Sequence, residues 1–186
     1  MIVLKVADVE TDKLSIKKVQ DNKYLHIGPG KVVIQTPWIT LGKYPLPNKQ
    51  YVKESAESIS LTVPVEYGGE IYTFFDNIDK YLLSNQPQSN GKLHHLVKTK
   101  DDGHYVSVKL YKETTLLIEN TESKVSNVYG WYDILEEGMQ VRMLFGFTKL
   151  WNLDGSFGFS VRVNKIQVKL GESVKKPEIR EDFTDD

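Results

Sequence analysis

The chain has 186 residues, of which 40% are hydrophobic and 26% charged, and its formal net charge is −1 at pH 7. This length predicts one domain with a sizeable core, and the composition is ordinary for a soluble protein. Because the chain has no cysteine, disulfide scaffolds, thiolate metal sites and cysteine nucleophiles are excluded. Early charges at the N-terminus and the lack of an apolar run of about 20 residues argue against a signal peptide and a membrane span. We therefore expect an intracellular protein.

Most of the chain alternates apolar and polar residues, as β-strands do. Short strands are expected at residues 2–7 and 14–16, a third over 31–41, and the clearest over 58–65. Pro37 in the third strand requires a sheet edge or a bulge. The loop between the last two strands combines cations with rings: Lys43, Tyr44, Lys49, Tyr51 and Lys53.

One segment has the period of a helix instead. After Gly68 and Gly69, apolar residues recur at the i, i+3, i+4, i+7 spacing of an amphipathic helix: Ile71, Phe74, Phe75, Ile78, Tyr81 and Leu82. The spacing predicts a helix near 70–84 that ends before the turn-rich residues 86–91. Because no second helix of similar quality follows, this one is expected to cap or plug a β-structure.

Strands resume over residues 104–111 and 114–119, and a polar loop follows over 119–127. In the first of these strands, one face is predicted to be buried and the other exposed. The buried face carries Val106, Val108 and Leu110, and the other carries Tyr105, Ser107, Lys109 and Tyr111.

The longest pattern is a C-terminal hairpin, with strands over 139–151 and 157–170 and a turn at Asp154-Gly155. In its second strand the apolar positions change from odd to even numbers near Asn164, which predicts a β-bulge there. Bulged, twisted strands with one helix indicate a mainly β protein, an OB-fold-like, partly open antiparallel barrel. We assign residues 1–171 to this domain and residues 172–186 to a flexible, disordered acidic tail.

Chemical motifs are scarce. HExxH, EF-hand, Walker and GxSxG sequences do not occur, and the four histidines, His26, His94, His95 and His104, have no metal-ligand spacing. Asp76 and Asp79 of the expected helix are interpreted as solvated surface residues. We therefore expect no catalytic residue, metal or cofactor, although an enzyme with a dispersed site stays open as an alternative.

Rings and cations suggest a binding surface. An exposed ring that stacks on a base contributes about 1–3 kcal/mol, and the stacking candidates are Trp38, Tyr105, Tyr111, Trp131 and Trp151. Core packing is the competing interpretation for such rings, above all for Trp38 and Trp131. The candidates for phosphate contacts are Lys43, Lys49, Lys109, Arg142, Lys149 and Arg162.

Charge is unevenly distributed. Residues 178–186 hold five acids and Arg180, a net charge of −4, which leaves +3 on the rest of the chain. A mildly basic body with an acidic arm suits a nucleic-acid binder whose arm competes for the same groove, but a solubilising tail has the same composition.

The succession of residues 30–39, the helix 70–83, HYVSVKLY and the C-terminal hairpin resembles the phage-type single-stranded DNA-binding proteins of phages and large eukaryotic DNA viruses. The resemblance covers residues 1–170 and the tail, and it rests on the order of elements. It implies a non-enzymatic OB-fold protein that coats and protects unwound single-stranded DNA in replication, recombination and repair, in the cytoplasm or nucleus of an infected cell.

The resemblance also implies that the tail recruits a polymerase or helicase through Glu181, Asp182, Phe183, Asp185 and Asp186. Such tails commonly end on an aromatic residue, whereas three residues follow Phe183 here. Exposed strand edges of an open barrel are compatible with a homodimer. DNA or RNA preference, site size and cooperativity stay open. So does a second class of function, a structural or assembly β-domain whose rings are buried and which has no affinity for nucleic acid.

Overall fold

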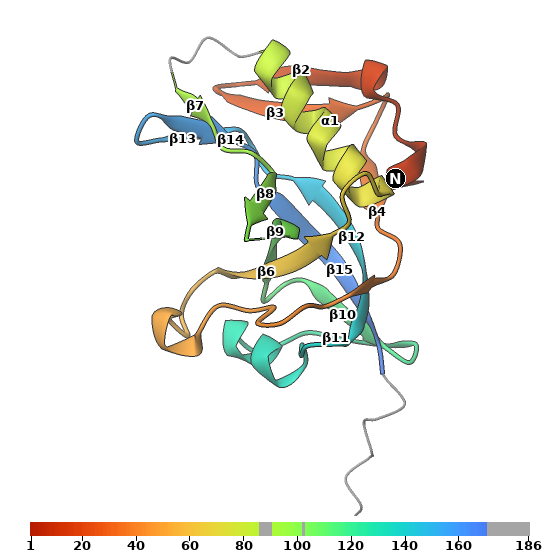
Figure 1. The fold of residues 1–186 in the computed structure, drawn as a ribbon, viewed down its shortest axis with the longest axis vertical. Coiled ribbons are helices and arrows are strands. Elements are labelled where there is room, and N and C mark those ends of the chain that lie inside the picture. Colours follow the sequence, from red (N-terminus) through yellow and green to blue (C-terminus); the bar gives the residue numbers. More distant parts are fainter. Residues whose placement is uncertain (86–90, 102, 171–186) are drawn as a thin grey trace, which may run out of the picture.

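The computed structural model describes residues 1–85, 91–101 and 103–170 (Figure 1). The predicted acidic tail, with Glu181, Asp182, Phe183, Asp185 and Asp186, lies outside these residues.

Three sheets and one α-helix make up the described fold (Figure 1). The main sheet contains ten strands: β1 (Ile2–Lys5), β4 (Val32–Gln35), β5 (Ile39–Thr40), β6 (Ser58–Val65), β8 (Val97–Lys100), β9 (Gly103–Tyr111), β10 (Thr115–Ile118), β11 (Thr121–Ser123), β12 (Gln140–Phe147) and β15 (Val161–Lys169). A two-stranded sheet pairs β2 (Leu14–Val19) with β3 (Asn22–Ile27), and a three-stranded sheet joins β13 (Trp151–Leu153), β14 (Ser156–Gly158) and β7 (Lys92–Leu93). The helix is α1 (Glu70–Ser84), and short 3-10 turns are η1 (Val6–Asp8), η2 (Thr11–Lys13), η3 (Lys49–Tyr51) and η4 (Val128–Asp133).

The main sheet curves but does not close, which confirms the predicted partly open, mainly β architecture. β6 pairs with β9, β9 with β15, β15 with β12, and β12 with β4 and β5. Beyond β5 the chain approaches β6 through a hydrogen bond from the Thr62 N–H to the Pro45 carbonyl (2.8 Å). The ladders are mixed: β6/β9 and β12/β15 are antiparallel as expected, whereas β9 and β10 both run parallel to β15.

The C-terminal hairpin has the predicted bulge. Leu144 pairs with Lys165 and Phe145 with Val163, so Asn164 is the extra residue and the buried parity changes across it. The turn at Asp154 (φ +50°) and Gly155 (φ +72°) is also confirmed. The hairpin is not continuous, however: its outer part, residues 151–158, leaves the main sheet and joins β7. We call this part the hairpin arm.

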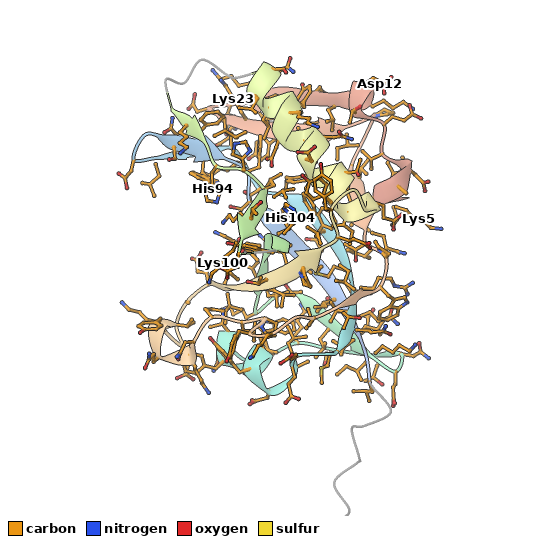
Figure 2. All side chains as sticks on the ribbon, in the orientation of Figure 1. Lys5, Asp12, Lys23, His94, Lys100 and His104 are labelled. Carbon is orange, nitrogen blue, oxygen red and sulfur yellow. The ribbon has the colours of Figure 1, made fainter. Side chains whose placement is uncertain are left out.

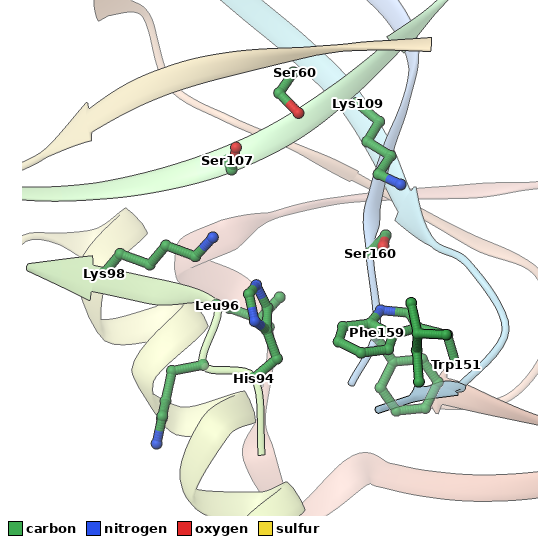
Figure 3. A pocket seen from close by; sticks show the side chains of 11 residues that line it. Ser60, His94, Leu96, Lys98, Ser107, Lys109, Trp151, Phe159 and Ser160 are labelled. Carbon is green, nitrogen blue, oxygen red and sulfur yellow. The ribbon is translucent and has the colours of Figure 1, made fainter. Parts of the chain in front are cut away.

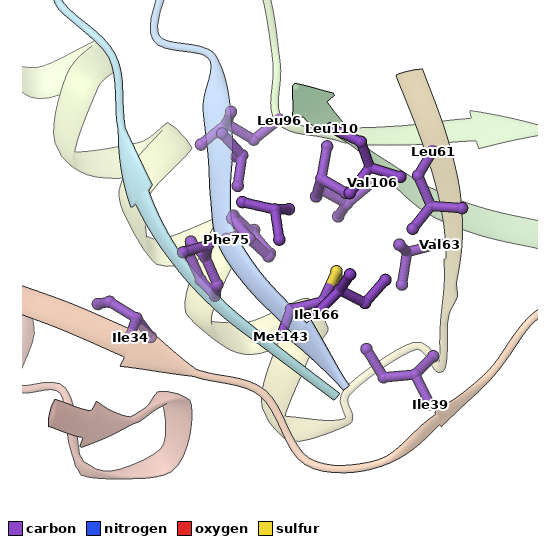
Figure 4. Close-up of a cluster of buried hydrophobic side chains, with 14 of the residues drawn as sticks. Ile34, Ile39, Leu61, Val63, Phe75, Leu96, Val106, Leu110, Met143 and Ile166 are labelled. Atoms are coloured by element: carbon purple, nitrogen blue, oxygen red, sulfur yellow. The ribbon is translucent and has the colours of Figure 1, made fainter. Parts of the chain in front are cut away.

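Helix α1 plugs the curved sheet, as its amphipathic pattern predicts. Its apolar side buries Phe74, Phe75, Ile78 and Leu82, and the Phe75 ring stacks on Phe145 with centroids 5.5 Å apart. Figure 4 shows Phe75 beside core side chains of β9, β12 and β15. In the described ranges, each helix falls short of the length and apolarity that crossing a membrane requires.

Candidate nucleic-acid interface

Strand β9 forms the floor of the candidate site. Val106, Val108 and Leu110 are buried in the core, so the period of two leaves Ser107 and Lys109 on the outer face, as predicted. Lys109 lies opposite Ser60 of β6. Because serine is small, this pairing leaves space above the sheet.

That space is part of a cavity of about 400 Å³ between the main sheet and the hairpin arm (Figure 3). We call it the Trp151 groove. The main sheet supplies Ser60, Ser107, Lys109 and Lys98 of β8, and the arm side supplies His94, Trp151, Phe159 and Ser160. His95, Leu96 and Leu153 complete the lining.

Rings and cations come from different sheets in this groove. Trp151 belongs to the arm, and His94 is tied to the arm by a hydrogen bond from its N–H to the Phe157 carbonyl (2.8 Å). The Trp151 and His94 rings meet edge to face, with centroids 5.4 Å apart. Lys98 and Lys109, by contrast, lie on neighbouring strands of the main sheet. A ligand in the groove would therefore meet aromatic rings and ammonium groups within one cavity.

A glycine allows the Trp151 indole to lie against the arm. Gly158 pairs with Trp151, and a Cβ at Gly158 would lie 3.2 Å from Trp151 Cζ2 and 3.3 Å from the His94 carbonyl oxygen. Any larger residue would push the indole outward. The sequence Phe157-Gly158-Phe159 thus positions the ring of the neighbouring strand.

The groove is electropositive. Lys98 and Lys109 line it with His94 and His95, and none of the described lining residues is acidic. Burial lowers the pKa of Lys98. Burial, together with the positive charges of Lys98 and His95, lowers the pKa of His94. Lys98 is half-buried, whereas His94 is exposed. The attraction between the Lys98 ammonium group and a phosphate is stronger there than at an open surface.

The wall that carries His94 and Lys98 is anchored by Asp79 of α1. Its carboxylate accepts hydrogen bonds from the Leu96 N–H (2.9 and 3.0 Å to the two oxygens) and from the Val97 N–H (3.2 Å). Asp79 is only 3% exposed, so its interpretation as a solvated residue is wrong. Burial raises its pKa, and the two N–H donors oppose that shift. The spacing of Asp79, four residues after Phe75 and three before Leu82, indicates that it lies on the apolar side of the helix.

The sequence-predicted stacking residues are divided by the structure. Trp151 lines the groove, and Tyr105 is half-buried opposite Lys98. Trp38 is 39% exposed but lies next to Arg142, whose guanidinium is 4.9 Å from its ring centroid. Tyr111 is covered by Arg162, 4.3 Å from its ring centroid.

Trp131 corrects the prediction. It is 0% exposed, and its indole N–H has no hydrogen-bond partner among the described residues. The 3-10 turn η4 points this ring into the core, so it offers no face to a base. Local sequence could not reveal this, because neighbouring Tyr129 and Tyr132 look equivalent but direct their hydroxyls to the Val52 and Pro47 carbonyls.

The predicted phosphate-binding cations do not all converge. Only Lys109 of this set lines the groove. Lys43 lies 5.5 Å from the Tyr44 ring centroid, Lys49 lies 4.7 Å from that of Tyr129, and Lys149 bridges to Tyr24 of β3. Arg142 hydrogen-bonds Gln167 (2.6 Å). Arg162 pairs with Lys109 across β15 and β9, on the same outer face.

His94, Lys98 and Tyr44 were not among the predicted site residues, although Tyr44 belongs to the loop in which the sequence combines cations with rings. Figure 2 shows His94 below the hairpin arm. Tyr44 is 77% exposed and lines a hollow that meets the Trp151 groove at Ser60. The strand signal of residues 97–100 is short, and its pairing with β9 depends on the turn between them, so Lys98 could be placed only after the register was known. Among the described residues, no group of three or more His, Asp or Glu could hold a metal ion.

No family model matches the chain, and no curated protein matches it in sequence. Solved structures do resemble it. The single-stranded DNA-binding protein from bacteriophage Enc34 is 13% identical, with 88% of this chain and 96% of that chain covered and a TM-score of 0.48. The same protein in complex with ssDNA is 12% identical, with 87% and 97% covered and a TM-score of 0.49. Gp2.5, a single-stranded DNA-binding protein encoded by bacteriophage T7, is 12% identical, with 84% and 100% covered and a TM-score of 0.44. These solved structures are of the class that the sequence resembles.

Proposed function

We propose that the protein binds single-stranded DNA along the outer face of β6 and β9, through the Trp151 groove. Bases would stack on Trp151, and phosphates would contact Lys98 and Lys109. The observation that carries this proposal is the composition of the groove: an indole, two lysines, three serine hydroxyls and no acid among the described residues that line its volume of about 400 Å³. Stacking rings beside a cationic track are the elements that sequence-tolerant single-strand binding requires.

The extent of the surface favours a polymer over a small anion. The groove continues at Ser60 into the hollow lined by Tyr44 and Pro47. On its other side, Lys109 neighbours Arg162 on the next strand. One nucleotide would leave most of this surface empty, whereas a strand of several nucleotides would use it. Lysines and serines impose few bidentate contacts on base edges, so binding should tolerate any sequence.

A structural β-domain is the second class of function considered for this chain. That alternative expects the tryptophan rings in the core, and Trp131 meets the expectation. Trp151 does not, because it remains half-exposed in a cationic groove. The groove therefore favours the DNA-binding proposal.

The wider role is proposed on the sequence resemblance. In this role the protein would coat and protect unwound DNA during viral replication, and it would have no enzymatic activity. Residues 1–171 would form the binding domain. Residues 172–186 would contact a polymerase or helicase through Glu181, Asp182, Phe183, Asp185 and Asp186. The charge of −4 on residues 178–186 supports this part of the proposal.

The proposal is tested by tryptophan fluorescence titration with an unstructured thymine oligonucleotide at low and moderate salt. We expect salt-sensitive quenching in the wild type. Trp151→Ala should weaken binding by about 1–3 kcal/mol, or about 5- to 150-fold, as measured with a fluorophore-labelled oligonucleotide, because the variant lacks the ring that is quenched. Trp131→Phe is the matched control, because it removes a buried indole and should leave the affinity unchanged. Absence of quenching at low salt, or equal affinity of Trp151→Ala and wild type, would contradict the proposal. A uridine oligoribonucleotide in the same assay determines whether RNA binds equally well.

A further inference from the structure

Gly146 of β12 is a glycine that the folded chain does not need. It lies within a strand and pairs with Arg162, and its φ is outside the left-handed region. A Cβ built on it would meet no atom within 4 Å. Neither backbone conformation nor packing therefore requires glycine, although glycine weakens a strand. Glycine in a strand interior marks a bulge, a bend or the close approach of a ligand or another backbone; the bulge at Asn164 lies close by in the same ladder, and the open space above Gly146 adds room for a ligand.

Gly146 forms part of the floor of a second cavity, of about 480 Å³. The β2–β3 hairpin contributes Tyr24 and His26, and Phe147, Arg162 and Asn164 lie around the glycine. We call this space the hairpin cavity. The hairpin is held over the sheet by the Leu150 N–H, which donates to the Lys23 carbonyl (2.8 Å), and by the bridge between Tyr24 and Lys149.

The chemistry of the hairpin cavity suits a planar ring that carries a phosphate. The Gly146 backbone offers a bare surface beside apolar lining residues of β3 and β4, and the size of the cavity lies in the range of small-molecule sites. Arg162 and Lys31 supply positive charge, and no acid is present among the described lining residues. The bulge leaves Asn164 unpaired and exposed, so its amide can donate to and accept from a base edge.

The hairpin cavity and the Trp151 groove lie on neighbouring strands. Lys109 of the groove pairs with Arg162 of the hairpin cavity in the parallel β9/β15 ladder, where adjacent strands are about 4.8 Å apart. Both side chains are on the outer face, opposite buried Val108 and Val161. Successive phosphates of one strand could therefore contact Lys109 and Arg162 in turn.

We propose that the hairpin cavity is a second subsite for a nucleotide of the same single strand, with its base on the bare backbone of Gly146 and its phosphate on Arg162. This inference rests on the proposed function. It adds a nucleotide position on β12 and β15 that lies beyond the groove.

Gly146→Val tests the subsite, with Gly146→Ala as a graded variant. Because the space above Gly146 is open and valine favours strands, the melting temperature should be unchanged or higher. Binding of a thymine oligonucleotide longer than the roughly 4–16 nucleotides that an OB fold covers should weaken about tenfold in Gly146→Val and less in Gly146→Ala. A tetranucleotide, detected by Trp151 quenching, should bind the variants and the wild type equally.

Arg162→Gln gives an independent readout, because Arg162 is exposed and its removal creates no cavity. The salt dependence of long-oligonucleotide binding should fall by about 0.7 in slope, and the slope for the tetranucleotide should fall by less.

The outcomes separate the two proposals. If the wild type binds neither oligonucleotide, the proposed function fails, and the subsite fails with it. If the wild type binds but folded Gly146→Val binds the long oligonucleotide equally well, only the subsite is overturned. Equal weakening for both lengths would also overturn it, because the substitution would then act on the groove. If Gly146→Val proves unstable, the open space is refuted and the Arg162→Gln slope decides.

Discussion

Replacement of Asp79 by asparagine should destabilise the protein by about 2 kcal/mol. The carboxylate is buried and is the acceptor for two backbone N–H groups, those of Leu96 and Val97. Hydrogen bonds to a charged acceptor contribute about 1.5–3 kcal/mol, and a buried donor left without a partner costs about 1–3 kcal/mol. Asparagine keeps one acceptor oxygen and places an amide N–H₂ where the other oxygen lay.

Burial of the charge acts in the opposite direction, as the raised pKa of Asp79 indicates. The net loss should therefore be smaller than the sum of the two hydrogen-bond contributions. For a chain of this size, about 2 kcal/mol corresponds to a fall of about 4–8 °C in the melting temperature. The affinity for a thymine oligonucleotide should fall as well, because Leu96 and Val97 lie between His94 and Lys98 of the groove wall.

Thermal unfolding followed by circular dichroism measures the first effect, and fluorescence titration below the transition measures the second. Asp76→Asn is the matched control, since Asp76 is on the same helix and forms an ion pair with Lys80 (2.6 Å) at the surface. That pair should contribute about 0.3–0.5 kcal/mol. A melting temperature for Asp79→Asn within a degree of that for Asp76→Asn would refute the anchoring role of the buried carboxylate.

Two further predictions concern the charges of the groove. The double variant Lys98→Gln, Lys109→Gln should reduce the salt slope of oligonucleotide binding by about 1.4, at about 0.7 for each phosphate that a lysine no longer neutralises, whereas Lys80→Gln on the helix should leave the slope unchanged. The pKa of His94 is lowered in the folded chain. As the pH falls through about 6.5, the unfolded chain therefore takes up a proton at His94 before the folded chain does, and this difference lowers the free energy of unfolding at acidic pH. A phosphate favours the protonated ring, so acidification should tighten DNA binding. In His94→Gln, the pH dependence of stability and that of DNA affinity should both diminish. An undiminished pH dependence of affinity would exclude His94 from contact with the phosphate.

The local features of the fold were predictable because short-range periods determine them. The helix near 70–84, the Asp154-Gly155 turn and the bulge at Asn164 all follow from the spacing of apolar residues and from turn chemistry. The departure of the hairpin arm from the main sheet was not predictable. It depends on pairing with β7, more than 60 residues earlier in the chain.

Site residues were predictable only where the sequence showed which face of a strand points outward. The outward face of β9 was predicted correctly, so Lys109 was available as a candidate. Its contact with DNA stays a prediction. Trp131 lies in a 3-10 turn, where no period of two or 3.6 distinguishes the buried ring from its neighbours. Asp79 was missed because a charged residue on an apolar side of a helix reveals its partner only in three dimensions.

The distribution of rings and cations over two sheets has a consequence for the bases that the groove would accept. Trp151 belongs to the arm, whereas Lys98 and Lys109 belong to the main sheet. The two sheets are joined at the base of the arm, where the Thr148 N–H donates to the Ser160 carbonyl (2.9 Å), and through the short segment between β7 and β8. Among the described strands, no ladder of hydrogen bonds pairs the arm with β8 or β9, so side-chain contacts set the distance between Trp151 and the two lysines. Purines and pyrimidines differ in breadth, and a distance that no ladder fixes would suit both without any residue having to distinguish them.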